Sequence, residues 1–92
     1  MQTIWKFELD SNKRFVINIP RVHTFLSVAV QDGKPMLWAL VDTSTATIEK
    51  TVKVIGTGWT VTEFLGRFVG TFLLESEGLV FHVFAGAEDA LS

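Results

Sequence analysis

The stretch Met36-Leu37-Trp38-Ala39-Leu40-Val41-Asp42 decides how this chain folds. Read with the period of two of a β-strand, it is apolar on both faces, because even-numbered and odd-numbered side chains are alike hydrophobic. A strand of this kind has no solvent face and has to be covered twice. The same pattern occurs in Val69–Leu74 and in Leu79–Phe84. The sequence therefore predicts a mainly β fold with a core built on both sides of several strands.

Two alternating segments near the N-terminus extend this interpretation. Trp5–Leu9 and Phe15–Ile19 alternate apolar and polar residues on either side of a polar turn at residues 10–13, a pattern that predicts a hairpin. Pro20 ends the second segment, because proline has no N–H to donate to a ladder. We expect about seven strands in all, in an antiparallel sheet that forms a sandwich or a barrel-like structure.

Two further segments complete the predicted sheet. Phe25–Gln31 leads into the Met36 strand through Asp32-Gly33-Lys34-Pro35, a turn sequence whose glycine tolerates a positive φ. This spacing predicts a second hairpin. Thr51–Ile55 keeps the charged Lys53 on one face, so we expect this strand near an edge of the sheet.

One segment follows a helical period instead. Thr60 and Glu63 have the spacing of a capping box, and apolar residues then follow at helical spacing, which predicts one short helix over Val61–Phe68. Residues 1–85 are expected to form a single β-rich domain. Residues 86–92 lack a strong apolar anchor and are expected to form a frayed tail.

Composition excludes several classes of function. The chain has 92 residues, 48% of them hydrophobic and 20% charged, which describes one globular domain. Its net charge of −2 provides no positive field for a nucleic-acid polymer. It has no cysteine, and therefore no disulfide, thiolate nucleophile or thiolate metal site. We find no signal peptide and no apolar run of roughly 18 residues, and we expect a cytoplasmic location without membrane contact.

The doubly apolar strands also bear on assembly. One sheet with one short helix leaves such strands uncovered, because a surface helix masks a stripe and not a whole face. Either the sheet closes on itself as a sandwich or barrel, or a second copy supplies the cover. We expect a homo-oligomer, a dimer or larger. Charge is also uneven, since residues 68–92 hold four acidic residues and no basic one.

Several sequence blocks give the chain a resemblance to a known group of proteins. They occur in the order Thr3-Ile4-Trp5-Lys6-Phe7-Glu8-Leu9, Gly33-Lys34-Pro35, Leu37-Trp38-Ala39-Leu40-Val41-Asp42, Gly56-Thr57-Gly58, Gly70-Thr71-Phe72 and Val80-Phe81-His82-Val83-Phe84. With them the chain resembles a family of small proteins from bacteriophages, prophages and bacteria, over about nine tenths of its length. The resemblance implies a phage-type origin, a location in the host cytoplasm, and a role as an antagonist of host defence. In that family a histidine commonly follows Gly-Thr-Gly, where Trp59 stands in this chain, which weakens a metal or catalytic role.

The segment Gly56-Thr57-Gly58-Trp59-Thr60 is the most suggestive candidate for a ligand site. Its glycines let backbone amides approach an anion, and a helix beginning at this point would add its positive end. Trp59 would stack on a planar ring while Lys53 or Arg67 meets its charge, which describes a ligand such as a nucleotide. The alternative is structural, with two glycines that only turn the chain.

The histidines support weaker hypotheses. His82 lies in a doubly apolar strand, where it is either a hydrogen-bonded core residue or a donor that faces a ligand. His23 follows a polar linker and is expected at the surface, and the two are too far apart in the chain to indicate a metal site. Ser27, His82 and Asp42 compose a triad on paper, which would indicate a small hydrolase. Asp42 is otherwise expected to cap the turn after its strand.

We therefore predict a non-catalytic, homo-oligomeric binding protein that sequesters a small anionic ligand, such as a nucleotide signal of host defence. The alternative partner is a host protein, which an edge strand or an apolar patch would dock. No cofactor and no metal is expected. The predicted ligand-binding residues are Gly56, Thr57, Gly58, Trp59, Thr60, Lys53, Arg67 and His82.

Overall fold

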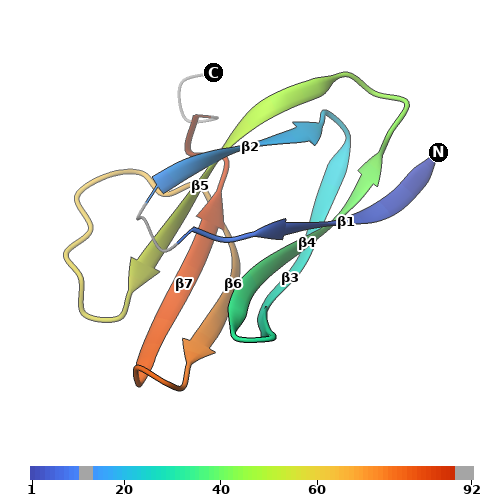
Figure 1. Cartoon of the computed structure of the whole chain (residues 1–92). Coiled ribbons are helices and arrows are strands. Elements are labelled where there is room, and N and C mark those ends of the chain that lie inside the picture. The colour runs from blue at the N-terminus through green and yellow to red at the C-terminus, as the bar shows by residue number, and fades with distance from the viewer. Residues whose placement is uncertain (11–13, 89–92) are drawn as a thin grey trace.

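The chain folds into two antiparallel sheets packed face to face. The structure is a computed structural model that describes residues 1–10 and 14–88 (Figure 1). One sheet has three strands in the order β1-β4-β3, and the other has four in the order β2-β5-β7-β6. The strands are β1 (Gln2–Glu8), β2 (Arg14–Pro20), β3 (His23–Gln31), β4 (Lys34–Asp42), β5 (Thr47–Gly56), β6 (Arg67–Leu74) and β7 (Leu79–Ala85). The prediction of a mainly β sandwich of about seven strands is confirmed.

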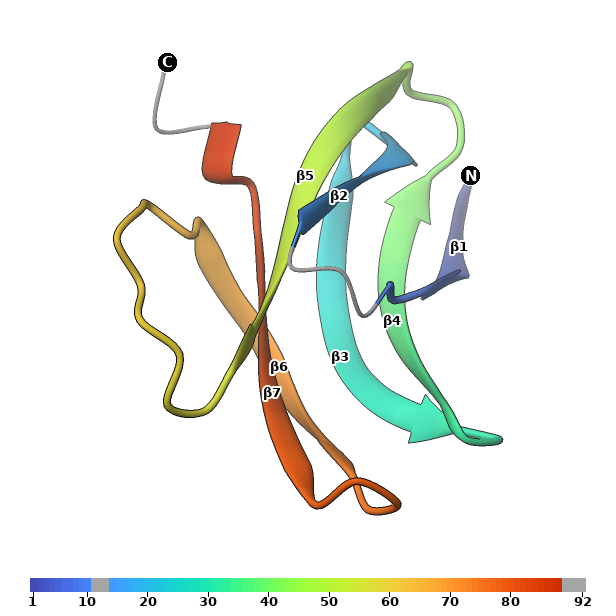
Figure 2. The same cartoon turned by 60° about the vertical axis from the view of Figure 1, so that its left-hand side comes forward.

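The core lies between the two sheets, which the turned view separates into layers (Figure 2). Side chains from the inner faces of both sheets meet there, and β3 lies against β6. A Cβ on Gly70 of β6 would come within 2.7 Å of the Val28 Cγ2 atom of β3, so glycine permits this close approach. The buried apolar residues are Leu9, Ile17, Ile19, Leu37, Ala39, Val41, Val52, Val54, Phe72, Phe81, Val83 and Ala85.

β4 shows how the doubly apolar strands are accommodated. Its odd-numbered residues Leu37, Ala39 and Val41 are fully buried against the other sheet. Its even-numbered apolar residues lie on the outer face of the three-stranded sheet and are only half-buried. The sandwich therefore covers one face of β4, and within the described residues the other face receives no second layer.

The predicted hairpin between the first two strands is wrong. β1 pairs with β4, from Gln2 opposite Asp42 to Glu8 opposite Met36, whereas β2 pairs with β5 in the other sheet. The alternation of apolar and polar residues shows that each strand has one buried face, but it does not determine which strand it pairs with. Both strands are apolar on one side, and each buries that side against the opposite sheet of the sandwich. Residues 11–13 of the expected turn lie outside the described residues.

The second predicted hairpin is confirmed. β3 and β4 are joined at Asp32 and Gly33, whose φ values of 53° and 78° are both positive, as a two-residue turn of type I′ requires. The register shifts between Phe25 and Ser27, which leaves Leu26 in a bulge. The bulge interrupts the regular alternation of faces along β3 at this point.

The expectation that the segment Thr51–Ile55 lies near an edge of the sheet is wrong. β5 is an inner strand between β2 and β7, and its Lys53 is only 3% exposed. β6 is an edge strand and leaves Phe68 and Leu73 exposed. The edge was expected because a charged side chain ordinarily faces solvent; here Glu63 and the Phe64 carbonyl, both in the segment 57–66, bind the Lys53 ammonium and cover it.

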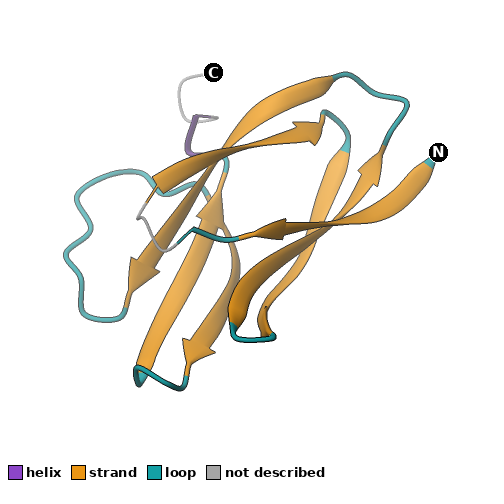
Figure 3. Ribbon diagram, in the orientation of Figure 1, coloured by secondary structure: helices purple, strands orange, loops and turns teal. Residues whose placement is uncertain are grey.

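The predicted helix over Val61–Phe68 is wrong. Residues 57–66 form a loop, and α-helix is absent from residues 1–10 and 14–88; Figure 3 shows one short helical turn at Ala87–Glu88. Glu63 does not return to the Thr60 amide as a capping box requires. Its carboxylate binds the Lys53 ammonium at 2.7 Å. A contact with the sheet thus replaces the local cap, and Gly66 with φ of 93° ends the loop.

The C-terminal segment also differs from expectation. Gly86 N–H donates to Thr51 O at 2.9 Å, and the Glu88 carboxylate accepts from Thr51 N–H at 3.0 Å. Residues 86–88 are therefore bonded to β5, while residues 89–92 lie outside the described residues. Within the described part of the chain we find no helix long and apolar enough to cross a membrane.

Substitutions at two glycines of the loop distinguish the cost of backbone strain from the cost of a steric clash. Both have positive φ, but a Cβ on Gly66 would lie 2.3 Å from Ala85 O, whereas a Cβ on Gly58 meets nothing within 4 Å. Gly58→Ala should cost about 1 kcal/mol for the left-handed backbone, and Gly66→Ala about 2 kcal/mol more, because a backbone oxygen has to move. Urea unfolding of both variants checks this. Equal losses would show that the loop does not pack against the end of β7.

Candidate functional site

The outer face of the four-stranded sheet is the most unusual surface of the molecule. Residues that pair across β5, β7 and β6 share this face, and most are apolar, although the outer face of an antiparallel sandwich is ordinarily polar. Phe68 is 60% exposed and Leu73 is 46% exposed, while the others are half-buried or polar. We call this the outer face; it comprises Lys53, Ile55, Phe68, Thr71, Leu73, Val80, His82 and Phe84.

His82 lies at the centre of the outer face. Its Nε2 atom is 2.8 Å from the Thr57 hydroxyl, and its Nδ1 atom is 3.0 Å from the Thr71 hydroxyl. Both ring nitrogens therefore have a hydroxyl partner, and the imidazole links the start of the loop to edge strand β6. The prediction left open whether His82 is a core residue or faces a ligand. It is half-buried and faces outward, and its hydrogen bonds are structural.

The Gly56–Thr60 segment is a tight turn next to His82. Trp59 N–H donates to Gly56 O at 3.1 Å, and Gly58 has a φ of 90°. The Trp59 indole occupies the space that a side chain on Gly56 would need, and it contacts the Phe81 ring edge-on at 5.9 Å. A hollow of 280 Å³ remains beside it. Its lining is Gly56, Thr57, Trp59, Gly78, Leu79, Val80 and Phe81, with no charged side chain.

The positive charge of Lys53 is neutralised by an ion pair within the chain. Its ammonium donates to the Glu63 carboxylate at 2.7 Å and to Phe64 O at 2.9 Å, beneath the loop. The hydrogen bond from Lys53, and then its charge, hold the pKa of Glu63 below the ordinary value. Because the ammonium is buried and has these acceptors, it does not offer a positive charge to a ligand.

Arg67 is remote from the turn. It pairs with Ala85 at one end of β7, whereas Gly56 pairs with Phe81 toward the other end. Arg67 lines a separate hollow of 440 Å³ together with His23 and Lys50. The structure thus gathers Gly56, Thr57 and Trp59 around one hollow. His82 joins this group only through the Thr57 hydroxyl, because it lies on the opposite face of β7 from Phe81, which the Trp59 ring contacts. The two predicted cations lie elsewhere.

The hypothetical catalytic triad of Ser27, His82 and Asp42 does not assemble. Ser27 pairs with Trp38 and faces outward from the three-stranded sheet, while His82 faces outward from the four-stranded sheet. The sandwich core therefore separates the two side chains. Asp42 caps its turn, accepting hydrogen bonds from the Ser44 hydroxyl at 2.6 Å and the Ser44 amide at 3.0 Å, and these bonds lower its pKa.

The other histidine is also engaged locally. His23 Nδ1 lies 2.7 Å from Pro20 O, and its ring contacts Phe25 edge-on. His23 is half-buried and not fully solvated. Among residues 1–10 and 14–88, no three His, Cys, Asp or Glu residues are grouped so that they would hold a metal ion.

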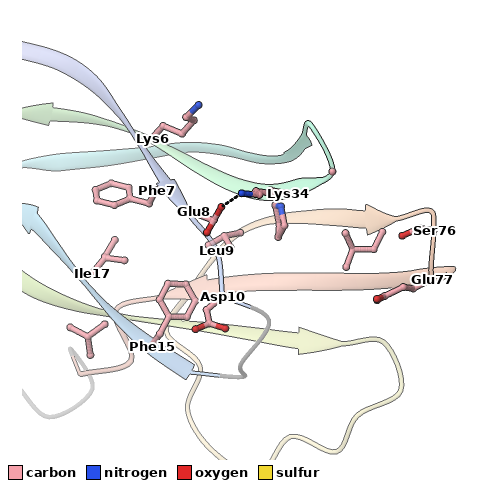
Figure 4. A pocket seen from close by; sticks show the side chains of 14 residues that line it. Lys6, Phe7, Glu8, Leu9, Asp10, Phe15, Ile17, Lys34, Ser76 and Glu77 are labelled. Carbon is pink, nitrogen blue, oxygen red and sulfur yellow. Dashed lines mark ion pairs between the residues drawn. The ribbon is translucent and has the colours of Figure 1, made fainter.

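Sequence reasoning missed a larger hollow of 930 Å³ between β1 and β2, on the open side of the sandwich (Figure 4). Phe7, Leu9, Phe15 and Ile17 form its apolar part. Glu8 and Lys34 form an ion pair of 3.5 Å at its margin. The hollow could not be anticipated, because the expected hairpin would have closed the side that these two strands leave open.

Comparison with known proteins identifies one family. The family described as "Domain of unknown function (DUF7352)" matches residues 1–92. No curated protein and no solved structure gives a significant match. The comparison therefore supports a family assignment without an activity, and any function has to be argued from the geometry of this chain.

The pair of Lys53 and Glu63 makes loop stability depend on pH. Because folding lowers the pKa of Glu63, the unfolded chain takes up the proton more readily, so the stabilisation is full above the ordinary value of 4.5 and is lost as pH falls through the lowered value. We expect wild type to be more stable than Glu63→Gln at pH 7, with a difference that shrinks toward pH 3.

Urea midpoints of both proteins across this range provide the measurement. Glu75→Gln, in the exposed turn after β6, controls for the loss of one negative charge. If Glu63→Gln behaves like Glu75→Gln at every pH, the ion pair does not hold the loop to the sheet.

Proposed function

The chain belongs to the DUF7352 family, and from its own geometry we propose that it is a non-catalytic binding domain whose outer face docks a partner protein. The observation that carries this proposal is the exposure of Phe68 and Leu73 on a sheet face that also holds the half-buried rings and aliphatic side chains of Ile55, Val80 and Phe84. Clustered apolar side chains on the surface of a small domain are typical of protein interfaces.

The charges around the outer face favour a protein over an anionic small molecule. Lys53 is neutralised by Glu63 and Arg67 lies at the far end of β7. Glu75 and Glu77 follow Leu73 in the exposed turn. The hollow beside the Gly56–Thr60 turn has no charged side chain in its lining, so it offers an anion no positive charge. The complementary partner is a polypeptide surface that presents apolar and basic side chains.

Two features support a non-catalytic role. The members of the only triad that the sequence suggested lie on opposite faces of the sandwich. Both nitrogens of His82 are hydrogen-bonded to threonine hydroxyls, as expected for a structural imidazole. A phage origin, implied by the resemblance to phage and prophage proteins, would make the partner a host protein; that setting stays a prediction.

The proposal predicts how the outer face selects a model ligand. The probes are two synthetic peptides in which leucine alternates with lysine or with glutamate. Wild type should bind the lysine peptide in preference to the glutamate peptide, and Phe68→Ser should weaken that binding about tenfold, as for an interface anchor. Fluorescence anisotropy of labelled peptide measures both effects.

The matched control is Val22→Ser, which removes an apolar side chain that is 52% exposed in the turn between β2 and β3. It should leave the affinity unchanged. Equal binding of both peptides, or equal effects of Phe68→Ser and Val22→Ser, would overturn the proposal. Saturable nucleotide binding that Trp59→Ala abolishes would instead support the small-ligand mode.

A further inference from the structure

β1 is a sheet edge with regularly placed hydrogen-bonding groups. In its ladder with β4, Leu9 N–H donates to Pro35 O at 2.9 Å, and Thr43 N–H donates to Met1 O at 2.9 Å. Because bonded and non-bonded pairs alternate in an antiparallel ladder, the odd-numbered residues of β1 bond to β4. The residues whose N–H and C=O groups point away from β4 are Gln2, Ile4, Lys6 and Glu8.

Of the other edge strands in the described structure, two are interrupted by bulges, and β2, whose ladder with β5 has no register shift, is protected only by its last residue. β3 has a bulge between Phe25 and Ser27, and β6 has one between Phe68 and Gly70. β2 ends in Pro20, which has no N–H. Bulges and prolines protect sheet edges from pairing with other chains. The β1 ladder has no register shift, and six of its seven residues are exposed.

We propose that β1 pairs antiparallel with β1 of a second copy of this chain, around a two-fold axis at Trp5. In this register Gln2 lies opposite the partner's Glu8, and Ile4 lies opposite the partner's Lys6. All four outward residues of each strand are then in bonded positions. Four bonded pairs with two hydrogen bonds each give eight hydrogen bonds across the interface.

The side chains fit the same register. Trp5, which is 36% exposed, meets the partner's Trp5 in a non-bonded pair, where side chains are closest and aromatic pairs are favourable. Thr3 lies opposite the partner's Phe7 on the same face. On the other face Ile4, which is 58% exposed, lies beside the aliphatic part of the partner's Lys6. Every other register along this strand leaves some outward groups unpaired.

This association joins two three-stranded sheets into one of six strands, in the order β3-β4-β1-β1-β4-β3. It uses no residue of the outer face of the four-stranded sheet. A dimer therefore presents two such faces, and the proposal goes beyond the proposed function without depending on it.

Disulfide cross-linking tests the register. The chain has no cysteine, so a single introduced cysteine can cross-link only between copies. In Trp5→Cys the two cysteines form a non-bonded pair with Cα atoms about 4.5 Å apart, which is within disulfide range. In Phe7→Cys they lie four residues out of register, about 13 Å apart. Mild oxidation should give a covalent dimer of Trp5→Cys and leave Phe7→Cys monomeric. Equal cross-linking of the two variants would overturn the register.

Sedimentation equilibrium tests the association without cysteine. Wild type should show a mass that rises from one to two copies with concentration. Ile4→Pro removes an N–H that β4 does not use, so the monomer should keep its circular dichroism spectrum while the dimer dissociation constant rises about tenfold or more. A single copy at every concentration, or wild-type association of Ile4→Pro, would overturn the proposal.

Discussion

The fold depends on one strand that has no polar face. The inner side chains of β4, Leu37, Ala39 and Val41, are fully buried and form the contact on which the opposite sheet packs. β4 also supplies the ladder for both of its neighbours, so β1 and β3 keep their places through it. The outer side chains Met36, Trp38 and Leu40 of β4 are as apolar as the inner ones, and within residues 1–10 and 14–88 no second layer covers them. The constraint that organises the sandwich thus also leaves apolar surface exposed.

The sequence predicted where the strands lie better than it predicted which strands pair. Apolar–polar alternation and short runs that are apolar on both faces together identified all seven strands. Asp32-Gly33 identified the β3–β4 hairpin, because consecutive positive φ values select those residue types. The pairing of β1 with β4 was not predictable, since many registers satisfy one apolar face. The helix over Val61–Phe68 failed because Glu63 has a stronger partner in Lys53 than in the local backbone. Capping-box spacing carries no information about a lysine ten residues earlier.

The candidate site shows the same limit. Proximity in sequence correctly grouped the Gly56–Thr60 turn, and His82 joins it through Thr57. Lys53 and Arg67 were added for their charge alone, and burial and topology remove both from the turn. The outer face had a signal in the sequence, namely the doubly apolar pattern of Val69–Leu74 and Leu79–Phe84, which indicated burial where the structure shows an exposed edge. Exposed apolar side chains are common to the outer face and to the β1 edge, and we propose both as surfaces for association.

Amide hydrogen exchange along β1, followed residue by residue by NMR, tests the pairing with β4 most directly. In dilute solution the account predicts slow exchange at Thr3, Trp5 and Phe7, whose amides bond to β4, and fast exchange at Ile4, Lys6 and Glu8. In concentrated solution the second set should become slow as well. Protection of the even-numbered amides in dilute solution, or uniform fast exchange along the strand at every concentration, would contradict the assignment of β1 to the edge of the β4 sheet.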